Sequence, residues 1–370
     1  MTLAPPAPPR SRERRARRPL RDALGVAAVT ALLLLLLEGG LRLFWPHADR
    51  LETSDGAPFA VRDASLGYRL HPAITVVHRA PEFTARYRTD ALGLRDGPWR
   101  AAGGDSAARP RVLLVGDSFT FGHGLDDGAT WAALLADGLR AGGASVDVVN
   151  AGVPGYSTAN EAAWLERLLP RLRPDAVVLA FLPNDLAGNE AGIAAGDGAG
   201  EGGGLGGLHV VRAARRLAFT SDALYVRLYL ATGRRSLASA PGLAGAGATQ
   251  AAFGRVARAC RRAGAQLAVV SIPQRFGVLY EQSGAREPGV DVRAADRFLA
   301  PLVTGTGAAW WPAFDTLRAA SRTGERYFPL DGHLNPDGAR VLAAFLVPRV
   351  RGLLATPAAP PPARPVPTRL

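Results

Sequence analysis

A serine in a tight turn directly after a short apolar run is the first feature of this sequence that could perform chemistry. The tetrapeptide Gly-Asp-Ser-Phe at 116–119 follows the apolar run 111–115, which has the length and composition of a buried strand. A turn of this kind lifts a hydroxyl above the edge of an α/β sheet. The hydroxyl becomes a nucleophile when a base removes its proton. Ser118 is therefore the predicted nucleophile.

The same three letters, Gly-Asp-Ser, also occur at 104–106, and this second copy serves as an internal comparison. No strand precedes it, and its neighbours are small and polar residues of the kind found in loops. We therefore assign no chemistry to Ser106. The context, and not the tripeptide itself, distinguishes Ser118.

His333 is predicted to be the base that activates Ser118. Asp331 lies two residues before it and supplies a carboxylate that can orient the imidazole. Asn335 is a good N-cap and Pro336 suits the first position of a helix, so the Asp-His pair is expected in a loop just ahead of a helix.

His123 competes with His333 for the role of base, because it lies only five residues after Ser118. It has no carboxylate at a fixed spacing, and we interpret it as a residue that lines the cleft. The other histidines lie in the N-terminal part of the chain or in a long insertion: His47, His71, His78 and His209.

Two further signals follow predicted strands, Asn-Ala-Gly at 150–152 and Pro-Asn-Asp at 183–185. With Ser118, Asp331 and His333 they stand in a fixed order along the chain. In these motifs the sequence resembles the SGNH (GDSL-type) hydrolase family, in its membrane-anchored bacterial form, over about 240 residues. A Gly-x-Ser-x-Gly motif is absent at Ser118, which argues against an ordinary α/β-hydrolase.

The resemblance implies an oxyanion hole made by the backbone N–H groups of Ser118 and Gly152 and by the side-chain amide of Asn184. Gly152 has no Cβ and so allows a close approach to its backbone. Asp117 and Asp185 are interpreted as carboxylates that brace their loops.

Two positions depart from the commonest pattern of the resembled family. Leu330 stands three residues before His333, where the family usually has the aspartate, so Asp331 is the proposed third member of the triad. Leu182 replaces the glycine of the usual Gly-x-Asn-Asp motif.

Composition excludes several other classes of protein. The net charge of +12 comes largely from the termini, because residues 1–21 carry +6 and residues 356–370 carry +2, which leaves +4 for the rest. No cluster of arginines with interleaved aromatic residues indicates nucleic-acid binding. The single cysteine, Cys260, excludes an intramolecular disulfide and is expected to be buried. No spacing typical of metal ligands occurs, and neither a cofactor nor a metal is expected.

An arginine-rich arm at 1–21 precedes an apolar segment at 22–45 that approaches the ~20 residues needed to span a bilayer. Glu38 and Arg42 interrupt it near its end. Because the arm holds seven arginines and residues 38–63 hold three, the arm is expected in the cytoplasm and the remainder outside it. A cleaved signal peptide is the alternative, but the apolar core is long for one and no cleavage motif follows it.

The expected fold is a three-layer α/β/α sandwich with a mainly parallel sheet, the flavodoxin-like fold of the resembled family, behind one transmembrane helix. Residues 46–110 are expected to form a juxtamembrane segment with an antiparallel pair at 73–77 and 83–87. Residues 111–354 are expected to form the hydrolase domain. Its predicted strands are 111–115, 145–150, 176–182, 266–272 and 308–314, and its predicted helices are 129–141, 159–172, 249–263, 292–303 and 336–347.

Residues 187–247 are interpreted as an insertion that could cap the site. Its glycine-rich first part, 192–207, is expected to be mobile. Its second part, 210–230, has apolar residues at roughly helical spacing: Val211, Leu217, Leu224 and Leu228. The proline-rich tail at 355–370 is expected to be disordered.

The sequence thus predicts a serine esterase anchored to the cell membrane, with its catalytic domain on the extracytoplasmic side and a small-molecule, glycan or lipid ester as substrate. An O-acyltransferase that uses the same residues is one alternative. A non-catalytic binding or scaffold protein of the envelope is another.

Overall fold

The computed structural model describes residues 12–44, 50–97, 109–191, 208–231 and 245–356. The chain divides into two compact units, one of residues 1–47 with 201–217 and one of residues 48–200 with 218–370. The expectations for the arm before residue 12, the glycine-rich stretch at 192–207 and the tail after residue 356 fall outside the described residues. The second unit carries all the predicted site residues.

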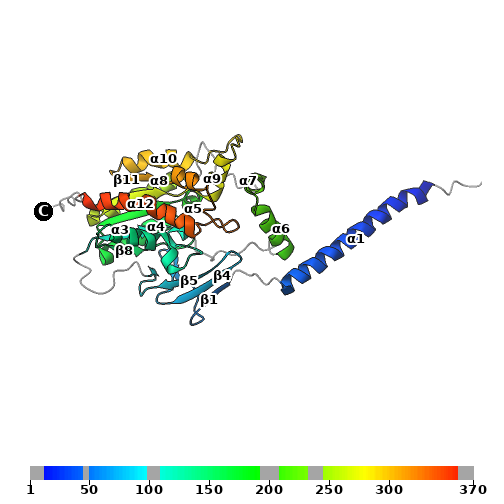
Figure 1. The fold of residues 1–370 in the computed structure, drawn as a ribbon, viewed down its shortest axis with the longest axis horizontal. Helices are drawn as coiled ribbons and strands as arrows, with labels where there is room; N and C mark the ends of the chain where they lie inside the picture. The colour runs from blue at the N-terminus through cyan, green and yellow to red at the C-terminus, as the bar shows by residue number, and fades with distance from the viewer. Residues whose placement is uncertain (1–11, 45–49, 98–108, 192–207, 232–244, 357–370) are drawn as a thin grey trace, which may run out of the picture. The chain divides into compact units, whose positions relative to one another are not determined.

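Within the described residues, one nine-stranded sheet runs through the second unit in the order β1-β4-β5-β6-β8-β7-β9-β10-β11 (Figure 1). Its strands are β1 (Arg50–Thr53), β4 (Thr75–Ala80), β5 (Phe83–Thr89), β6 (Arg95–Asp96), β7 (Arg111–Val115), β8 (Asp147–Asn150), β9 (Ala176–Phe181), β10 (Gln266–Ser271) and β11 (Ala309–Pro312). The five strands from β7 to β11 are parallel. Their order, second-first-third-fourth-fifth, is the flavodoxin-like order of doubly wound folds. The expected α/β sandwich is confirmed.

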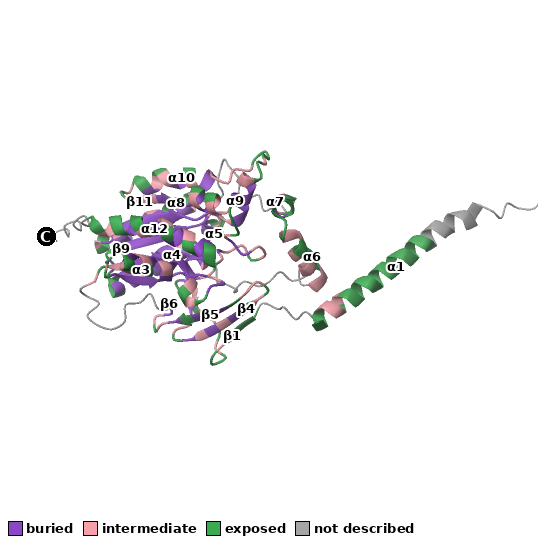
Figure 2. Ribbon diagram, in the orientation of Figure 1, coloured by how far each residue is buried: buried purple, intermediate pink, exposed green. Residues whose placement is uncertain are grey.

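Helices cover both faces of the parallel strands because successive strand residues point to opposite faces. Val112 and Leu114 lie in one core cluster with α3 and α12, whereas Leu113 and Val115 lie in another with α4, α8 and α10. Figure 2 shows the buried sheet between these layers. The helices are α3 (Trp131–Ala141), α12 (Pro336–Ala355), α4 (Thr158–Leu172), α8 (Ala246–Ala263) and α10 (Ala294–Thr304). Cys260 is buried in α8, as expected.

Short elements that the sequence patterns do not indicate fill the connections. They are α2 (Ser118–Phe121), the 3-10 helix η2 (Asp127–Ala129), α5 (Asp185–Ala191), α9 (Arg275–Gln282), α11 (Phe314–Ala320), and a separate two-stranded sheet of β2 (Ala60–Asp63) and β3 (Gly67–Leu70). Each is too short to show a clear period. The predicted strand at 308–314 ends at Pro312, and Phe314 begins α11 instead.

The segment at 46–110 is not separate from the hydrolase domain. The expected antiparallel pair is present as β4 and β5, with Val76 opposite Tyr87. β6 then joins this hairpin to the parallel strands, because Arg95 pairs with Asn150 of β8. The predicted boundary at residue 111 is therefore corrected: four antiparallel strands extend the same sheet.

The insertion contains two described helices instead of one, α6 (His209–Phe219) and α7 (Asp222–Ala231). The apolar residues Leu224 and Leu228 of α7 are 42% and 36% exposed. Tyr225 and Val226 are buried instead and pack with Phe276 of α9. The aromatic residues of α7 decide its orientation, since Tyr229 stacks on Phe276 with ring centroids 4.1 Å apart.

The first unit contains helix α1 (Arg12–Phe44). Its segment Asp22–Phe44 is long and apolar enough to cross a membrane, and none of it is buried; a signal sequence has the same properties. Near its end, Glu38 accepts the backbone N–H groups of His209 and Val210 at 3.0 and 2.9 Å. A carboxylate in this apolar helix is thus paired with the N-terminus of α6, where helix N–H groups favour negative charge.

Candidate active site

Ser118 is the first residue of α2, which starts where β7 ends. The Oδ1 of Asp117 accepts the backbone N–H of Phe119 at 2.8 Å and caps this helix, so the expected bracing role of Asp117 is confirmed. A Cβ at Gly116 would come within 2.1 Å of Thr120 Oγ1. Gly116 and Asp117 therefore allow a helix to begin immediately after the strand.

The fold brings the three strand-end motifs to one edge of the sheet. Ser118 follows β7, Gly152 follows β8 and Asn184 follows β9, and these strands are parallel neighbours with β7 in the centre. The chain reverses its winding direction on either side of β7. Ligands of open α/β sheets bind at the carboxyl ends of the strands at such a switch point.

His333 lies between Ser118 and Asp331. Its Nε2 is 2.6 Å from Ser118 Oγ, and its Nδ1 is 2.6 Å from Asp331 Oδ1. Because a carboxylate oxygen only accepts, Nδ1 carries the proton, and Nε2 is left to accept the hydroxyl hydrogen of Ser118. These are the distances and the tautomer that general-base activation of a serine requires.

The turn that holds Asp331 and His333 depends on the glycine between them. Gly332 has a φ of 89°, in the left-handed region that favours glycine. Its N–H donates to Phe328 O at 2.8 Å, and the Phe328 N–H donates to His333 O at 2.8 Å, which closes the turn. The Asp331 carboxylate also accepts the backbone N–H of His333 at 3.1 Å.

The Asp331 carboxylate is held in its ionised form. Burial alone would raise its pKa, but hydrogen bonds from His123 and His333 outweigh burial and lower the pKa below its usual range. The charge that stabilises a protonated His333 is therefore present throughout the neutral pH range.

The His123 side chain contacts Asp331 and not the Ser118 hydroxyl. Its Nε2 lies 3.3 Å from Asp331 Oδ2, and its ring lies against that of His333 with centroids 4.4 Å apart. Burial lowers the pKa of His123, so the neutral imidazole donates its Nε2–H to the carboxylate. In this geometry His333, and not His123, is in place to act as the base.

The Ser118 and Gly152 backbone N–H groups differ in their availability. The Ser118 N–H donates to no acceptor among the residues that the structure describes. The Gly152 N–H donates to Asn150 Oδ1 at 3.0 Å, so it is engaged within its own loop. Gly152 also has a packing reason to be glycine, because a Cβ there would come within 2.3 Å of the Phe121 backbone nitrogen.

The side-chain amide of Asn184 is oriented by Gln274, whose Nε2 donates to Asn184 Oδ1 at 3.1 Å. The same amide helps to lower the pKa of the Asp117 carboxyl against the effect of burial. An amide nitrogen has two hydrogens, so it can donate to a further acceptor. The sequence does not indicate a role for Gln274. This residue follows β10, and it lies near Asn184 because β10 pairs with β9 in the sheet.

Three buried carboxyl groups lie close to one another near the nucleophile. Burial raises the pKa of Asp117 to about 6. Burial also raises the pKa values of Glu161 and Asp185 well above their usual range, and repulsion from neighbouring carboxylates adds to the effect. The site therefore favours the neutral forms of Glu161 and Asp185. This limits the negative charge near the serine, where a further negative charge would develop during acyl transfer. Asp185 Oδ2 also accepts the Leu182 N–H at 3.3 Å, as expected for a loop-bracing residue.

Arg95 is a buried residue whose position the sequence does not predict. Its guanidinium donates to the carbonyls of Phe121 and Gly122 at 3.0 and 3.3 Å and lies between the rings of Tyr87 and Phe121. It therefore ties β6 and the hairpin to the carboxyl end of α2, directly before His123. Its buried environment could be found only from the fold.

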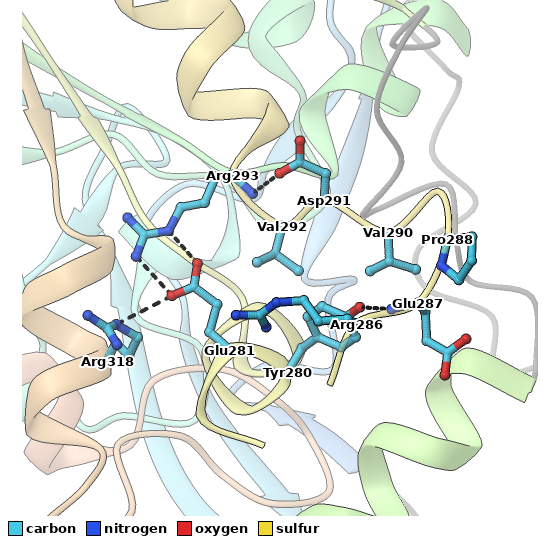
Figure 3. A pocket seen from close by; sticks show the side chains of 10 residues that line it. All are labelled: Tyr280, Glu281, Arg286, Glu287, Pro288, Val290, Asp291, Val292, Arg293 and Arg318. Carbon is cyan, nitrogen blue, oxygen red and sulfur yellow. Dashed lines mark hydrogen bonds and ion pairs between the residues drawn. The ribbon is translucent and has the colours of Figure 1, made fainter. Parts of the chain in front are cut away.

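A cavity of about 570 Å³ lies elsewhere, under the loop after α9 (Figure 3). Part of its charged lining is internally paired, because Glu281 accepts from Arg293 at 2.6 Å and lies 3.4 Å from Arg318. None of the predicted site residues lines it. Among the described residues, His123, Asp331 and His333 are close enough together to bind a metal ion, but here they pair with each other and with Ser118.

Residues 114–341 match the GDSL-like Lipase/Acylhydrolase family, and the chain belongs to this family. The match includes all the predicted site residues and excludes β1 and β4–β6. The chain is 35% identical over 80 residues to an arylesterase of Vibrio mimicus and 39% identical over 79 residues to esterase TesA of Pseudomonas aeruginosa. These alignments cover 22% and 21% of the chain and about two fifths of each relative's length, 40% and 39%.

Solved structures of similar fold include TesA, with 20% identity and a TM-score of 0.42 over 66% of this chain and 99% of that one. Another is the psychrotrophic esterase EstA of Pseudoalteromonas sp., with 15% identity and a TM-score of 0.39 over the same shares of the two chains.

Proposed function

We propose that this protein is a serine esterase that hydrolyses its substrate through an acyl-serine intermediate. The observation that carries the proposal is the continuous hydrogen-bond chain from Ser118 through His333 to Asp331, with both distances at 2.6 Å. Family membership and the esterase relatives support the same reaction class. The substrate is an ester of a small molecule, a glycan or a lipid.

In the first half-reaction, Ser118 Oγ attacks the ester carbonyl while its proton passes to His333 Nε2. The carbonyl oxygen becomes negative and accepts hydrogen bonds from the Ser118 N–H and the Asn184 amide. The Gly152 N–H can join them only if it leaves Asn150. The bond to the alcohol oxygen then breaks, and the alcohol leaves with the proton of His333.

In the second half-reaction, a water molecule attacks the acyl group on Ser118 and gives its proton to His333. The second tetrahedral intermediate expels Ser118 Oγ, which takes the proton back, and the acid is released. Throughout, Asp331 stabilises the imidazolium and keeps the correct ring nitrogen protonated.

This proposal is tested with the full-length protein purified in detergent and p-nitrophenyl esters of acetate, butyrate and octanoate. Release of p-nitrophenol with saturation kinetics would support it, and the preferred chain length would define the acyl site. Failure to cleave any ester, with the fold intact by circular dichroism, would contradict it.

Replacement of Asn184 by alanine is expected to lower kcat by about 10²- to 10³-fold with little change in KM, because an oxyanion donor acts mainly in the transition state. Steady-state kinetics on the best p-nitrophenyl ester measure this effect. Asn335→Ala, which removes the cap of α12 instead, should reduce stability and leave kcat nearly unchanged. Equal losses of kcat in the two variants would count against the oxyanion role.

We also propose that α1 anchors the protein in the cell membrane, with residues 46–370 on the extracytoplasmic side. The apolar length of Asp22–Phe44 and the excess of arginine before it support this orientation.

A C-terminal fusion to alkaline phosphatase is expected to be active in a bacterial host, because this reporter folds only outside the cytoplasm. The matched control fuses the reporter directly after residue 21, which should leave it inactive in the cytoplasm. Recovery of a soluble, N-terminally shortened protein would show instead that the apolar segment is a cleaved signal.

A further inference from the structure

Asp331 is held by two side chains that lie far from it in the sequence. Glu82 accepts the backbone N–H of Asp331 at 2.7 Å and that of Leu330 at 2.9 and 3.0 Å. His123 donates to the Oδ2 of Asp331. We propose that Glu82 and His123 are positioning residues that hold Asp331 against His333, so that the N-terminal hairpin completes the active site. This inference rests on the esterase function proposed above.

Glu82 reaches the turn at 328–333, here called the acidic turn, because of the register of the β4–β5 hairpin. Ala80 of β4 pairs with Phe83 of β5, which leaves Pro81 and Glu82 as a two-residue turn. Phe83 then packs against the ring of Phe328, with centroids 5.1 Å apart, at the start of the turn that carries Asp331. The tip of the hairpin therefore packs directly against this turn.

The guanidinium of Arg275 provides a second contact that holds the acidic turn. Arg275 Nη1 donates to the carbonyl of Pro329 at 2.9 Å, so the turn has its N–H groups on Glu82 and a carbonyl on Arg275. Burial raises the pKa of Glu82, while the two N–H groups favour its ionised form. Because its N–H groups and its Pro329 carbonyl are already hydrogen-bonded, the turn loses little conformational entropy when the transition state forms.

His123 holds the second oxygen of the same carboxylate. Its place is set by α2, because the N–H of His123 donates to Ser118 O at 3.0 Å and Arg95 holds the preceding carbonyl of Gly122. Its ring also packs against those of His78 and Phe83, with centroids 5.0 and 5.5 Å away. With Oδ1 on His333 and Oδ2 on His123, the Asp331 carboxylate cannot rotate without breaking a hydrogen bond.

This arrangement gives a reason for the unusual spacing of the triad. The aspartate stands two residues before the histidine, and the N–H groups of Leu330 and Asp331 find no acceptor within the turn. Glu82, which the family match does not include, satisfies these groups. Hydrogen bonds from Leu330 and Asp331 to Glu82 therefore join the β4–β5 hairpin to the Asp-Gly-His turn.

The test compares kinetics of the full-length protein in detergent on a p-nitrophenyl ester. Glu82→Ala and His123→Leu are each expected to lower kcat about 10- to 100-fold, as small displacements of catalytic groups do, with KM nearly constant. Glu82→Gln and His123→Gln should recover part of the rate, because an acceptor oxygen and an N–H donor are kept. Glu52→Ala, in β1 of the same antiparallel strands, and His71→Leu are the matched controls and should leave kcat near the wild-type value.

The decisive measurement repeats both substitutions in an Asp331→Asn background. Residues that act through Asp331 should cause no further loss of kcat there, whereas a general structural role would lower the rate by the same factor in both backgrounds. Equal factors, or single variants with wild-type kcat, would overturn the inference. A wild-type protein that cleaves no ester would refute the proposed function instead, so the two failures are distinguishable.

Discussion

Replacement of Ser118 by alanine is expected to lower kcat for ester hydrolysis by about 10⁵- to 10⁶-fold, to the level left by binding and oxyanion contacts alone. The alanine removes the oxygen that attacks the ester, which His333 Nε2 approaches to 2.6 Å. The fold should persist, because α2 is capped by Asp117 and not by Ser118. Steady-state kinetics and a thermal melt of the two proteins provide the measurement.

Ser106→Ala is the matched control, since Ser106 belongs to the other Gly-Asp-Ser tripeptide and no apolar run precedes it in the sequence. Its kcat should equal that of the wild type. A fluorophosphonate probe should likewise label the wild type and Ser106→Ala but not Ser118→Ala. Hydrolysis that survives in Ser118→Ala, or is lost equally in both variants, would refute the assignment of the nucleophile.

The second large effect is expected at Asp331. Asp331→Asn should lower kcat by about 10⁴-fold, because an asparagine amide favours the wrong tautomer of His333. His333→Ala should cost at least as much. The double variant should be little worse than the more damaged single variant, since the members of a triad act as a unit. Single-turnover and steady-state rates on one p-nitrophenyl ester test all three variants.

Asp337, in the first turn of α12, is the internal control. Asp337→Asn removes a favourable charge at a helix N-terminus, which contributes up to ~1 kcal/mol to stability. It also weakens ion pairs with Arg340 and Arg326 at the surface and should leave the reaction unaffected. Near wild-type turnover in Asp331→Asn together with an inactive His123→Ala would make His123 the base. The Asp-Gly-His turn would then be structural.

Much of the α/β domain follows from local sequence patterns. Strands buried on both faces produce continuous apolar runs, and each of the five predicted strands from 111 to 314 overlaps a strand of the parallel sheet. The helices that cover the sheet are long enough to show their apolar period. A serine at a strand end and an Asp-Gly-His turn before a capped helix are likewise local signals, so the candidate triad could be named from the sequence.

The membership of the N-terminal strands in the sheet could not be predicted in this way. β6 has only two residues, and one pair, Arg95 with Asn150, joins the hairpin to the parallel strands. No periodicity marks so short an element. The buried face of α7 likewise depends on tertiary contacts, because Tyr225 and Tyr229 pack on α9 and leave Leu224 and Leu228 exposed.

The sequence by itself determined the nucleophile motif, the order of the strand-end loops and the apolar N-terminal helix, because each depends on residues that are close together in the chain. The tertiary structure alone decided which groups surround Asp331. The His123 side chain contacts this carboxylate and not the Ser118 hydroxyl, and Glu82 accepts from a backbone N–H group 249 residues away. Contacts over such separations depend on how strands pair across the sheet, which no local spacing of residues records.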